Sequence, residues 1–467
     1  MDTKIFRTYD IRGIVGVDFH PYEAELVGKA FGTYVQEKFN GNRVVVGHDN
    51  RFSSNELNDY FISGLLSTGC DVTDIGLSLT PLVHFAVVRH EFDAGCIITA
   101  SHNPKEFNGF RFDGPKCLSI YNDNLQEIKK IMEGGLFAEG EGKIAYAEVF
   151  GDYASDIASR IRLQKKLRVV IDCGNGAASE FAPRLYESLG VEVLPQHCVL
   201  HGGFPNHIAD PEQHINLEDA MRRVVEEKAD AGIGFDTDGD RYGVVDEKGR
   251  FYTNDLVLVP LAKDILRRFP GSKILYDVKS SYVLPHEIEK AGGKAIMIRT
   301  GHPYFRNAMR EDPTILIAGE VSSHTFIQDN YYGYDDGLFA GLRLLEILSR
   351  TDEKLSSFFD SLEQSFMTEE IRLPTPDDQK ATIVEGIKKS LEGSWDVISI
   401  DGVRVQFTSK AWALVRASNT SPYLTVRFEA DSQKKLQEVI GIMHARLQQY
   451  SVVDISHLTE LLLNKDI

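Results

Sequence analysis

Short apolar runs rich in β-branched residues alternate with helix-compatible stretches along most of the chain, and the same order of elements occurs three times. Each series opens with a strand that runs into an aspartate, at residues 44–49, 169–172 and 274–277. A helix-compatible stretch follows, and then a second strand entered through glycine, at residues 69–72, 190–193 and 292–296. The pattern predicts three similar α/β units.

A third strand completes each series, and a polar loop follows it directly. These third strands are predicted at residues 94–98, 231–235 and 315–318. Open α/β sheets bind their ligands at the carboxyl ends of strands. Polar loops at the same position in three units therefore indicate functional sites.

The pattern changes after Pro374 and Pro376. Strand-rich stretches at 396–407 and 413–429 precede a closing helix near 434–449, which predicts an α+β unit. A chain of 467 residues is long enough for three or four domains. We therefore expect an α/β fold of three similar domains with mixed sheets plus a C-terminal α+β domain.

Composition limits what the loops can bind. The formal net charge of −18 repels nucleic-acid phosphates and anionic membranes, so we expect no nucleic-acid and no membrane partner. The first residues contain no apolar signal-peptide core, and no stretch has the roughly 18 apolar residues of a spanning helix, which predicts a cytoplasmic protein. The five cysteines lack CxxC spacing and are expected to be reduced, buried thiols.

The first polar loop presents a serine, Ser101, at the end of a buried strand. Pro104 follows shortly afterwards and can open a helix, an arrangement that holds a serine hydroxyl on a rigid turn facing a crevice. Alternatively, Ser101 only caps that helix.

The second loop carries alternating carboxylates, at Asp236, Asp238 and Asp240. Three negative charges so close together require a cation, and oxygen ligands favour Mg²⁺. A calcium-binding EF-hand is the alternative, because Glu247 is the twelfth residue of the loop. Arg241 stands at the sixth position, where that motif needs glycine, and strand-like sequence on both sides also argues against it.

The third and fourth loops carry groups suited to binding hydroxyl groups and phosphate, respectively. Glu320, Ser322 and His324 alternate, so in an extended loop their side chains would share one side and could bind hydroxyl groups. A purely structural carboxylate and histidine are the alternative. Residues 416–422 gather guanidinium, hydroxyl and amide donors in a turn, with Arg427 on the next strand, and this combination fits phosphate. A solvated turn is the simpler interpretation.

Taken together, these loops resemble the α-D-phosphohexomutase family, and most of all its bacterial phosphomannomutase/phosphoglucomutase branch. The resemblance covers nearly the whole chain, and its motifs occur in the family's order at residues 9–13, 99–112, 234–241, 319–324 and 416–422.

The resemblance implies four domains around a central cleft, which we expect at residues 1–148, 149–250, 251–366 and 367–467. It implies phosphoryl transfer between the 1- and 6-positions of a hexose monophosphate, mannose or glucose, with Mg²⁺ as cofactor and hexose 1,6-bisphosphate as intermediate and activator. Ser101 would carry the phosphoryl group, and the metal would be bound by Ser101, Asp236, Asp238 and Asp240. The substrate would be bound by Tyr9, Arg12, Arg241, Lys279, His302, Glu320, Ser322, His324, Arg416, Ser418, Asn419, Thr420 and Arg427. Arg12 would also assist catalysis.

Two positions depart from the family pattern. Arg111 stands where the family usually has a lysine, a candidate for moving the proton of the attacking hydroxyl, and arginine stays charged at working pH. We therefore expect Arg111 to stabilise charge and His324 to act as acid and base, with His102 as the second candidate. Ser323 stands where glycine is common, so a positive φ there would cost about 1 kcal/mol or reshape the loop.

Two other functions stay open. A phosphoglucosamine mutase would share the serine and metal loops. A catalytically silent sugar-phosphate-binding protein would have no use for a nucleophile beside a metal. Glucose and mannose differ at one hydroxyl, and the sequence leaves both open; a monomer or weak homodimer is expected.

Overall fold

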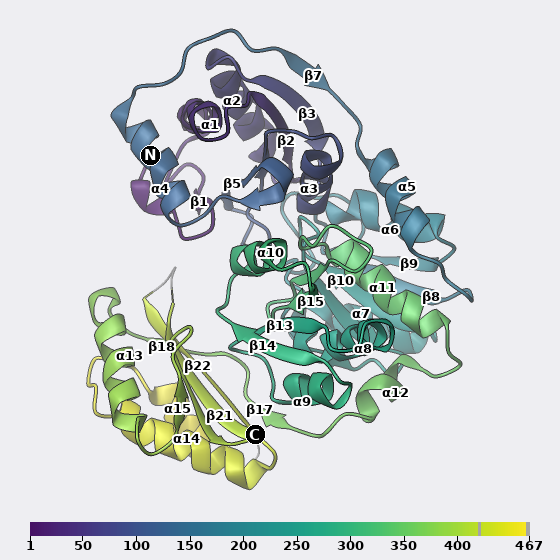
Figure 1. The fold of residues 1–467 in the computed structure, drawn as a ribbon, viewed down its shortest axis with the longest axis vertical. Coiled ribbons are helices and arrows are strands. Elements are labelled where there is room, and N and C mark those ends of the chain that lie inside the picture. The colour runs from purple at the N-terminus through teal and green to yellow at the C-terminus, as the bar shows by residue number, and fades with distance from the viewer. Residues whose placement is uncertain (419–421, 464–467) are drawn as a thin grey trace. The chain divides into compact units, whose positions relative to one another are not determined.

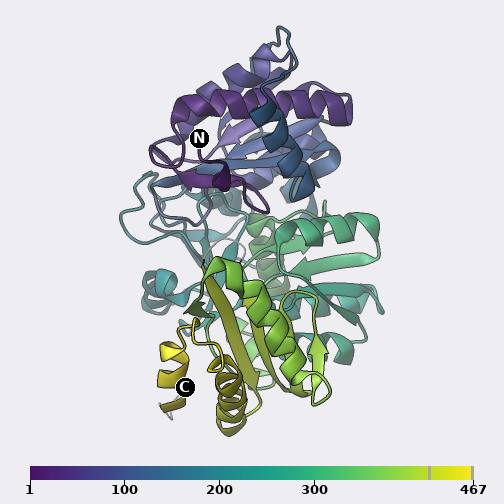
Figure 2. The same cartoon turned by 90° about the vertical axis from the view of Figure 1, so that its left-hand side faces the viewer.

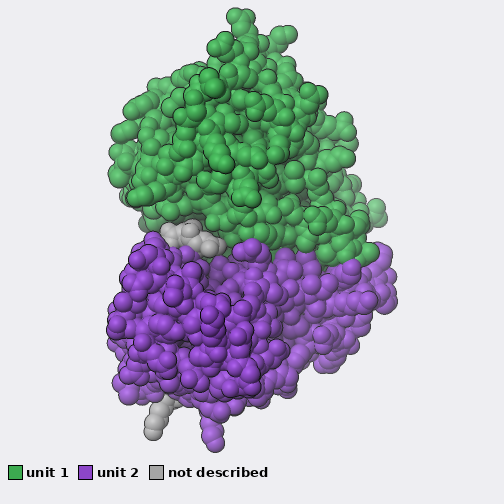
Figure 3. All heavy atoms as spheres, turned by 60° about the vertical axis from the view of Figure 1, so that its left-hand side comes forward, with its two compact units in different colours: residues 1–265, 301–359 green, residues 266–300, 360–467 purple. Residues whose placement is uncertain are grey.

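The computed structural model describes residues 1–418 and 422–463. The chain forms two compact units (Figure 3). The first comprises residues 1–265 and 301–359, and the second comprises residues 266–300 and 360–467.

A mixed sheet of seven strands forms the N-terminal part of the first unit (Figure 1). Its strands are β1 (Ile11–Ile14), β2 (Arg43–His48), β3 (Asp71–Leu77), β4 (Ala94–Ile98), β5 (Phe107–Gly114), β6 (Leu118–Ser119) and β7 (Ile144–Tyr146). The order is β1-β5-β4-β2-β3-β7, and β6 pairs with β5. β2 pairs in parallel with β3 and β4, whereas β5 runs antiparallel to β4.

Helices pack against this sheet, so its central strands are buried on both faces and consist largely of apolar residues. These helices are α1 (Ala24–Phe39), α2 (Ser54–Ser67), α3 (Thr80–Arg89) and α4 (Asp123–Gly134). α1 and α2 pack against each other, and α1 is seen lengthwise in Figure 2. Phe31 stacks on Phe112 with ring centroids 4.2 Å apart, and Phe61 lies beside Phe110, which gives this core an aromatic centre.

A second mixed sheet of five strands follows, in the order β12-β11-β10-β8-β9. Its strands are β8 (Arg168–Asp172), β9 (Glu192–Gln196), β10 (Ala231–Phe235), β11 (Tyr242–Asp246) and β12 (Phe251–Tyr252). Its helices are α5 (Phe150–Arg160), α6 (Ala178–Ser188) and α7 (Glu218–Glu226). β8, β9 and β10 are parallel, and the antiparallel hairpin of β10 and β11 presents its connecting loop at the carboxyl end of β10.

The next part of the chain contributes to both units, with α8 (Asn254–Arg268) crossing from one to the other. In the second unit, β13 (Lys273–Asp277) and β14 (Lys294–Ile298) pair in parallel through α9 (Val283–Lys290). In the first unit, β15 (Ile315–Gly319) and β16 (Thr325–Ile327) form an antiparallel hairpin. Its helices are α10 (His302–Glu311), α11 (Gly337–Ser349) and α12 (Leu355–Asp360).

The C-terminal sheet is wholly antiparallel, as the predicted α+β unit requires. Its strands are β17 (Phe366–Met367), β18 (Ile371–Pro374), β19 (Asp396–Ile398), β20 (Val403–Thr408), β21 (Ala411–Ala417) and β22 (Tyr423–Ala430). Its helices are α13 (Asp377–Leu391), α14 (Gln433–Leu447) and α15 (Ser456–Leu463). α13 and α14 pack on this sheet over a continuous apolar core (Figure 1).

In the described part of the chain, four short 3-10 helices lie between these elements, at Thr3–Ile5, Pro21–Glu23, Pro115–Cys117 and His214–Leu217. Over residues 1–418 and 422–463, none of the helices has the length and apolar character needed to cross a bilayer. All five cysteines are free thiols; four are buried as predicted, whereas Cys198 is half-buried.

Candidate active site

The serine loop joins β4 to β5. Thr99 Oγ1 accepts a hydrogen bond from the backbone N–H of Ser101 at 2.8 Å, which fixes the turn. The prediction of a helix after Pro104 is wrong: the Pro104 carbonyl accepts from Phe107 N–H at 3.0 Å, and the antiparallel strand β5 follows at once. Hydrogen bonds to β4 and β1 hold this segment as a strand. A proline in the local sequence does not reveal such pairing with distant strands. The helix-cap interpretation of Ser101 therefore does not hold.

Ser101 itself has a backbone φ of +49°, in the left-handed region. This conformation costs a residue with a side chain about 1 kcal/mol or more, and such strain occurs often at functional sites. The Ser101 hydroxyl donates to Asp236 Oδ2 at 2.7 Å and lies 3.0 Å from His102 Nδ1. The serine and metal loops, which are far apart in sequence, therefore meet at this hydroxyl.

A buried arginine that was not predicted from the sequence, Arg51, binds the backbone of the serine loop. The Arg51 guanidinium donates to the backbone carbonyls of Ser101, Asn103, Pro104 and Phe107, with lengths between 2.6 and 3.1 Å. Its Nε donates to Asp49 Oδ2 at 3.0 Å. Burial lowers the pKa of Arg51 and the Asp49 charge opposes this effect. The signal in the sequence is the aspartate turn after the first strand, which continues into Arg51.

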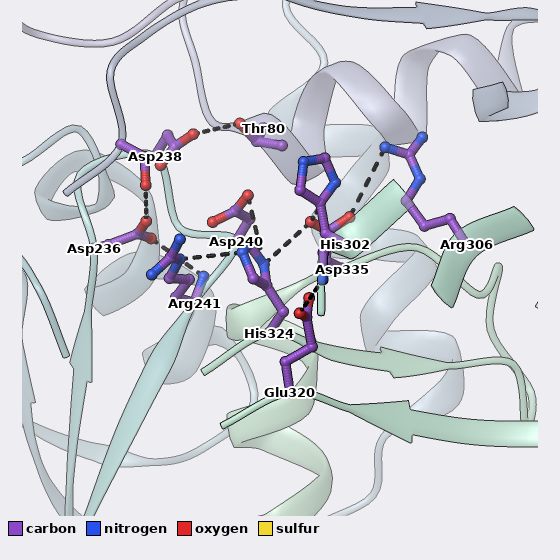
Figure 4. Close-up of polar contacts among 12 residues, drawn as sticks. Thr80, Asp236, Asp238, Asp240, Arg241, His302, Arg306, Glu320, His324 and Asp335 are labelled. Carbon is purple, nitrogen blue, oxygen red and sulfur yellow. Dashed lines mark hydrogen bonds and ion pairs between the residues drawn. The ribbon is translucent and has the colours of Figure 1, made fainter. Parts of the chain in front are cut away.

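The metal loop between β10 and β11 holds the three predicted carboxylates, and it is drawn in Figure 4. Asp236, Asp238 and Asp240 are at most 1% exposed, and one oxygen from each lies within 4.8 Å of the others. Burial and the neighbouring carboxylates raise the pKa of both Asp236 and Asp238. Thr80 Oγ1, at the start of α3, donates to Asp238 Oδ2 at 2.6 Å. Carboxylates crowded in this way fit a hard divalent cation.

The strands that border this loop exclude the EF-hand alternative, which requires helices. Gly239 has a φ of +72°, a conformation that glycine adopts at no steric cost, and it lets the loop turn between Asp238 and Asp240.

Arg111 lies in the middle of buried ion pairs and is 7% exposed. Its guanidinium pairs with Asp240, donates to Asp335 Oδ2 at 2.7 Å and approaches His302 Nδ1 at 2.9 Å. Asp335 was not predicted, because it belongs to a pair of aspartates before α11 that forms no recognised motif. It also lies 3.2 Å from His324 Nδ1.

Three further buried residues extend this network. His84 Nδ1 lies 2.7 Å from Asp113 Oδ2, and Arg306 donates to Asp113 Oδ1 at 2.6 Å. Burial lowers the pKa of His84, whereas the Asp113 charge raises it. The net result is a pKa well above the ordinary histidine value. A protonated His84 with Arg111 and Arg306 balances the charges of Asp113, Asp240 and Asp335.

His324 is oriented by partners on both nitrogens. Arg241 Nε donates to His324 Nε2 at 3.1 Å, so the ring proton belongs on Nδ1, which faces Asp335. His302 lies beside it, with ring centroids 5.5 Å apart, and burial together with the Arg111 charge lowers the pKa of His302 well below its usual value. Burial and nearby arginines likewise lower the pKa of His102.

The third polar loop, residues 319–324, is called the sugar loop here and forms a tight turn. The alternation of Glu320, Ser322 and His324 had predicted an extended loop. Ser323 N–H donates to the Glu320 carbonyl at 3.1 Å, and Glu320 N–H donates to the His324 carbonyl at 2.9 Å. Ser323 has a φ of +72°, so the strain anticipated for a serine at this position is present. Glu320 is 1% exposed and accepts from Gly301 N–H at 2.7 Å, whereas Ser322 is half-buried.

Of the remaining predicted residues in the first unit, Arg12 donates to Asn103 Oδ1 at 3.1 Å and so lies beside the serine loop. Tyr9 lies edge-on to His302, with centroids 5.8 Å apart. Arg241 is also 3.6 Å from Glu212 Oε2. The structure therefore brings the predicted serine, metal and sugar loops of this unit into one connected group.

The predicted phosphate residues belong to the second unit. Arg416 lies on β21, 3.2 Å from Asp401 Oδ2, and the strand register puts Arg416 and Arg427 on the same face of the sheet. Lys380 Nζ donates to the Ser418 carbonyl at 2.7 Å. Lys279 Nζ, at the end of β13, lies 3.6 Å from Glu370 Oε2. The predicted contacts of Asn419 and Thr420 lie outside the described residues.

The chain also matches known proteins over nearly its whole length. Three alpha/beta/alpha domain models of phosphoglucomutase/phosphomannomutase match residues 3–139, 148–249 and 253–366, and the C-terminal domain model matches residues 370–443. A phosphomannomutase/phosphoglucomutase of Pseudomonas putida is 40% identical over 446 residues, which is 95% of each chain. A phosphoglucomutase of Neisseria gonorrhoeae is 38% identical over 441 residues, covering 93% of this chain and 95% of the relative.

Among solved structures, a phosphoglucomutase/phosphomannomutase family protein from Burkholderia thailandensis superposes with a TM-score of 0.90 at 35% identity, over 96% of this chain and 97% of the other. The fold and the site therefore define an intramolecular phosphotransferase, an isomerase of the α-D-phosphohexomutase class with four α/β-type domains. The chain belongs to the phosphoglucomutase/phosphomannomutase family. The predicted fold class and family are confirmed.

Proposed function

We propose that this enzyme moves a phosphoryl group between the 1- and 6-positions of mannose or glucose monophosphate, with Ser101 as the residue that carries the group. The hydrogen bond of 2.7 Å from the Ser101 hydroxyl to Asp236 is the observation that carries this proposal. It joins a nucleophile to a cluster of three buried carboxylates, an arrangement that phosphoryl transfer needs and a binding protein does not.

The oxygens of Ser101, Asp236, Asp238 and Asp240 would hold Mg²⁺. When bound, the metal supplies positive charge against the transferring phosphoryl group. Crowded carboxylates with raised pKa values fit this role, because a cation offsets their repulsion.

In the first half-reaction, a hydroxyl oxygen of the sugar attacks the phosphorus of phosphorylated Ser101. The bond from phosphorus to Oγ breaks, the bond from phosphorus to the sugar oxygen forms, and the hydroxyl proton passes to a base. The resulting hexose 1,6-bisphosphate then returns its other phosphoryl group to Ser101. Added bisphosphate would therefore act as an activator, because it phosphorylates the resting serine.

His324 is the base that fits this step best. Arg111 is charged and held by Asp240 and Asp335, so it stabilises charge. His324 Nε2 carries no proton while it accepts from Arg241, and Asp335 fixes the ring through Nδ1. If Arg241 turns toward a substrate phosphate, Nε2 becomes free to accept the hydroxyl proton. His102 stays neutral beside Ser101 and is the second candidate.

The remaining residues would bind the substrate. Glu320 and Ser322 would hold sugar hydroxyls, while Tyr9, Arg12, Lys279 and His302 would contact the sugar phosphate. The phosphate that does not react would be bound by Arg416, Ser418, Asn419 and Thr420, supported by Arg427. The Nε–H groups of Arg416 and Arg427 are buried and donate to no partner among the described residues, which supports an anion site. We retain the proposed domains 1–148, 149–250, 251–366 and 367–467.

A single set of measurements tests this function. The purified enzyme should carry one phosphate on Ser101 by intact mass and peptide mapping, and it should convert mannose 1-phosphate or glucose 1-phosphate to the 6-phosphate faster when bisphosphate is added. Faster turnover of glucosamine 1-phosphate would favour the glucosamine alternative. Binding of hexose phosphates without turnover would favour the silent binding protein.

A further inference from the structure

A second cluster of metal-ligand side chains lies in the first unit, outside the residues assigned to the reaction. Asp172 ends β8, His197 directly follows β9, and His207 lies in the segment after it. One ligand atom from each lies within 4.8 Å of the other two. Because β8 and β9 are parallel neighbours, their carboxyl ends bring Asp172 and His197 together.

Asp172 has an unused acceptor. Its side chain is fully buried, and Oδ1 accepts from Gly174 N–H at 2.9 Å and lies 3.0 Å from His207 Nε2. The second oxygen, Oδ2, is buried and has no hydrogen-bond partner among the described residues. A buried carboxylate oxygen without a partner is costly, and a bound cation removes that cost.

His207 presents Nε2 to this carboxylate because its other nitrogen is engaged. Nδ1 lies 2.9 Å from the Ile208 carbonyl, which accepts its proton. A proton on Nε2 is donated to Asp172 Oδ1 at 3.0 Å, so this nitrogen and this oxygen face each other. A metal ion would bind between them by displacing that proton.

His197 is arranged in the same way. Its Nε2 donates to Asp219 Oδ2 at 3.0 Å, and Nδ1 accepts a hydrogen bond from the side-chain amide of Asn206, which a bound ion would displace. Metal-binding histidines commonly donate one ring N–H to a carboxylate or carbonyl and bind the metal through the other nitrogen. Both histidine side chains are between 13% and 15% exposed, so an ion can reach them from solvent.

We propose that Asp172, His197 and His207 form a binding site for Zn²⁺ or a similar borderline cation, separate from the Mg²⁺ site of the reaction. Two imidazole nitrogens and one carboxylate oxygen suit Zn²⁺, with water as a fourth ligand, whereas Mg²⁺ prefers oxygen alone. The bound ion joins the segment after β9 to the end of β8. Asp172 pairs with Gly234 on β10, two residues before Asp236, so the ion stabilises the sheet from which the catalytic metal loop emerges.

The test titrates the full chain with Zn²⁺ by calorimetry while Mg²⁺ is in large excess, and repeats the titration with Co²⁺ to record its visible absorption. We expect one equivalent of Zn²⁺ per chain and a Co²⁺ spectrum typical of nitrogen ligands. His197→Gln should weaken binding by about tenfold or more. Asp238→Asn, in the catalytic cluster, should leave this binding unchanged. His214→Gln serves as a matched control, because His214 is an exposed histidine of the same segment outside the cluster.

His207→Gln should have the same effect as His197→Gln if it folds, but it removes the partner of a buried aspartate, so His197→Gln decides the question. Equal Zn²⁺ affinity in the wild type and His197→Gln would overturn the proposal. Loss of all Zn²⁺ binding in Asp238→Asn would do so as well, because it would assign the ion to the catalytic cluster.

Discussion

The Ser101 hydroxyl donates to Asp236 Oδ2 over 2.7 Å, although 135 positions separate the two residues in the chain. Each residue lies just beyond the carboxyl end of a buried strand, β4 for Ser101 and β10 for Asp236. The contact therefore depends on the packing of two sheets, and its geometry is set by the core of the first unit.

Ser101→Ala should abolish turnover while the unfolding midpoint stays within a few degrees of the wild type. The hydroxyl donates to Asp236 and does not support a strand, and no other group in the loop can form a phosphate ester at that position. Mutase assays with added 1,6-bisphosphate and thermal unfolding check both parts. Near-normal turnover would assign the phosphoryl group to another residue.

Chelation of divalent metal should stop the reaction, and Mg²⁺ should restore it. Asp238→Asn should raise the Mg²⁺ concentration needed for half-maximal activity by tenfold or more, on the order of 1–2 kcal/mol for one lost charge. Glu247→Gln is the matched control, because Glu247 accepts from Ser356 and lies outside the carboxylate cluster. Full activity in excess chelator would contradict the metal assignment.

Arg51→Lys should lower kcat by about tenfold to a hundredfold and leave KM nearly unchanged, because a misplaced nucleophile slows transfer without weakening substrate binding. Lysine keeps a charge beside Asp49 but cannot bind four carbonyls at once. Arg43→Lys is the control, since Arg43 also donates to backbone carbonyls but is exposed and lies away from the loop. Equal loss of kcat in both variants would remove this role from Arg51.

Asp336 should make stability depend on pH. Burial raises its pKa to about 6, although Tyr331, Phe339 and Tyr153 donate to it. Since the folded state holds this proton more tightly than the unfolded chain, stability falls as pH rises from about 4 to about 6 and is constant above that. The contribution is on the order of 3 kcal/mol.

The Asp336→Asn variant has no carboxyl group to titrate at this position. The free energy of unfolding of the variant minus that of the wild type should therefore be larger at pH 7.5 than at pH 4.5. Denaturant unfolding of both proteins at the two pH values measures this difference. Parallel pH dependence in the two proteins would mean that Asp336 titrates normally.

Arg416→Ala should raise KM for hexose phosphates and release more 1,6-bisphosphate into solution, because a charge-assisted contact to the phosphate that does not react is lost. Steady-state kinetics with quantified bisphosphate release check this. Arg372→Ala is the control, since Arg372 lies over the Tyr423 ring on an exposed part of the same sheet. Unchanged KM and release in Arg416→Ala would mean that the phosphate binds elsewhere.

The strands that precede the functional loops were predictable because their signal is local. The apolar runs at 94–98, 231–235 and 242–246 coincide with β4, β10 and β11. The same local signal predicted the nucleophile and the metal ligands, because each lies in a short motif whose side chains indicate its chemistry. These residues are Ser101, Asp236, Asp238 and Asp240.

What the sequence did not predict depends on long-range packing. Arg51 and Asp335 act through partners far away in the chain, and the aspartates beside them in the sequence do not reveal those partners. The missing helix after Pro104 reflects pairing of β5 with β4 and β1. The sugar loop closes into a turn because Asn254 donates to the carbonyls of Glu320 and His324, a contact that side-chain alternation cannot express.

The backbone conformation at Ser101 also bears on which amino acid can serve as the nucleophile. Threonine carries the same hydroxyl, but its branched Cβ is poorly tolerated at a φ of +49°. An exchange of serine for threonine is therefore disfavoured at this position, although both residues supply a hydroxyl. The strained turn thus selects serine over threonine as the residue that can carry the phosphoryl group.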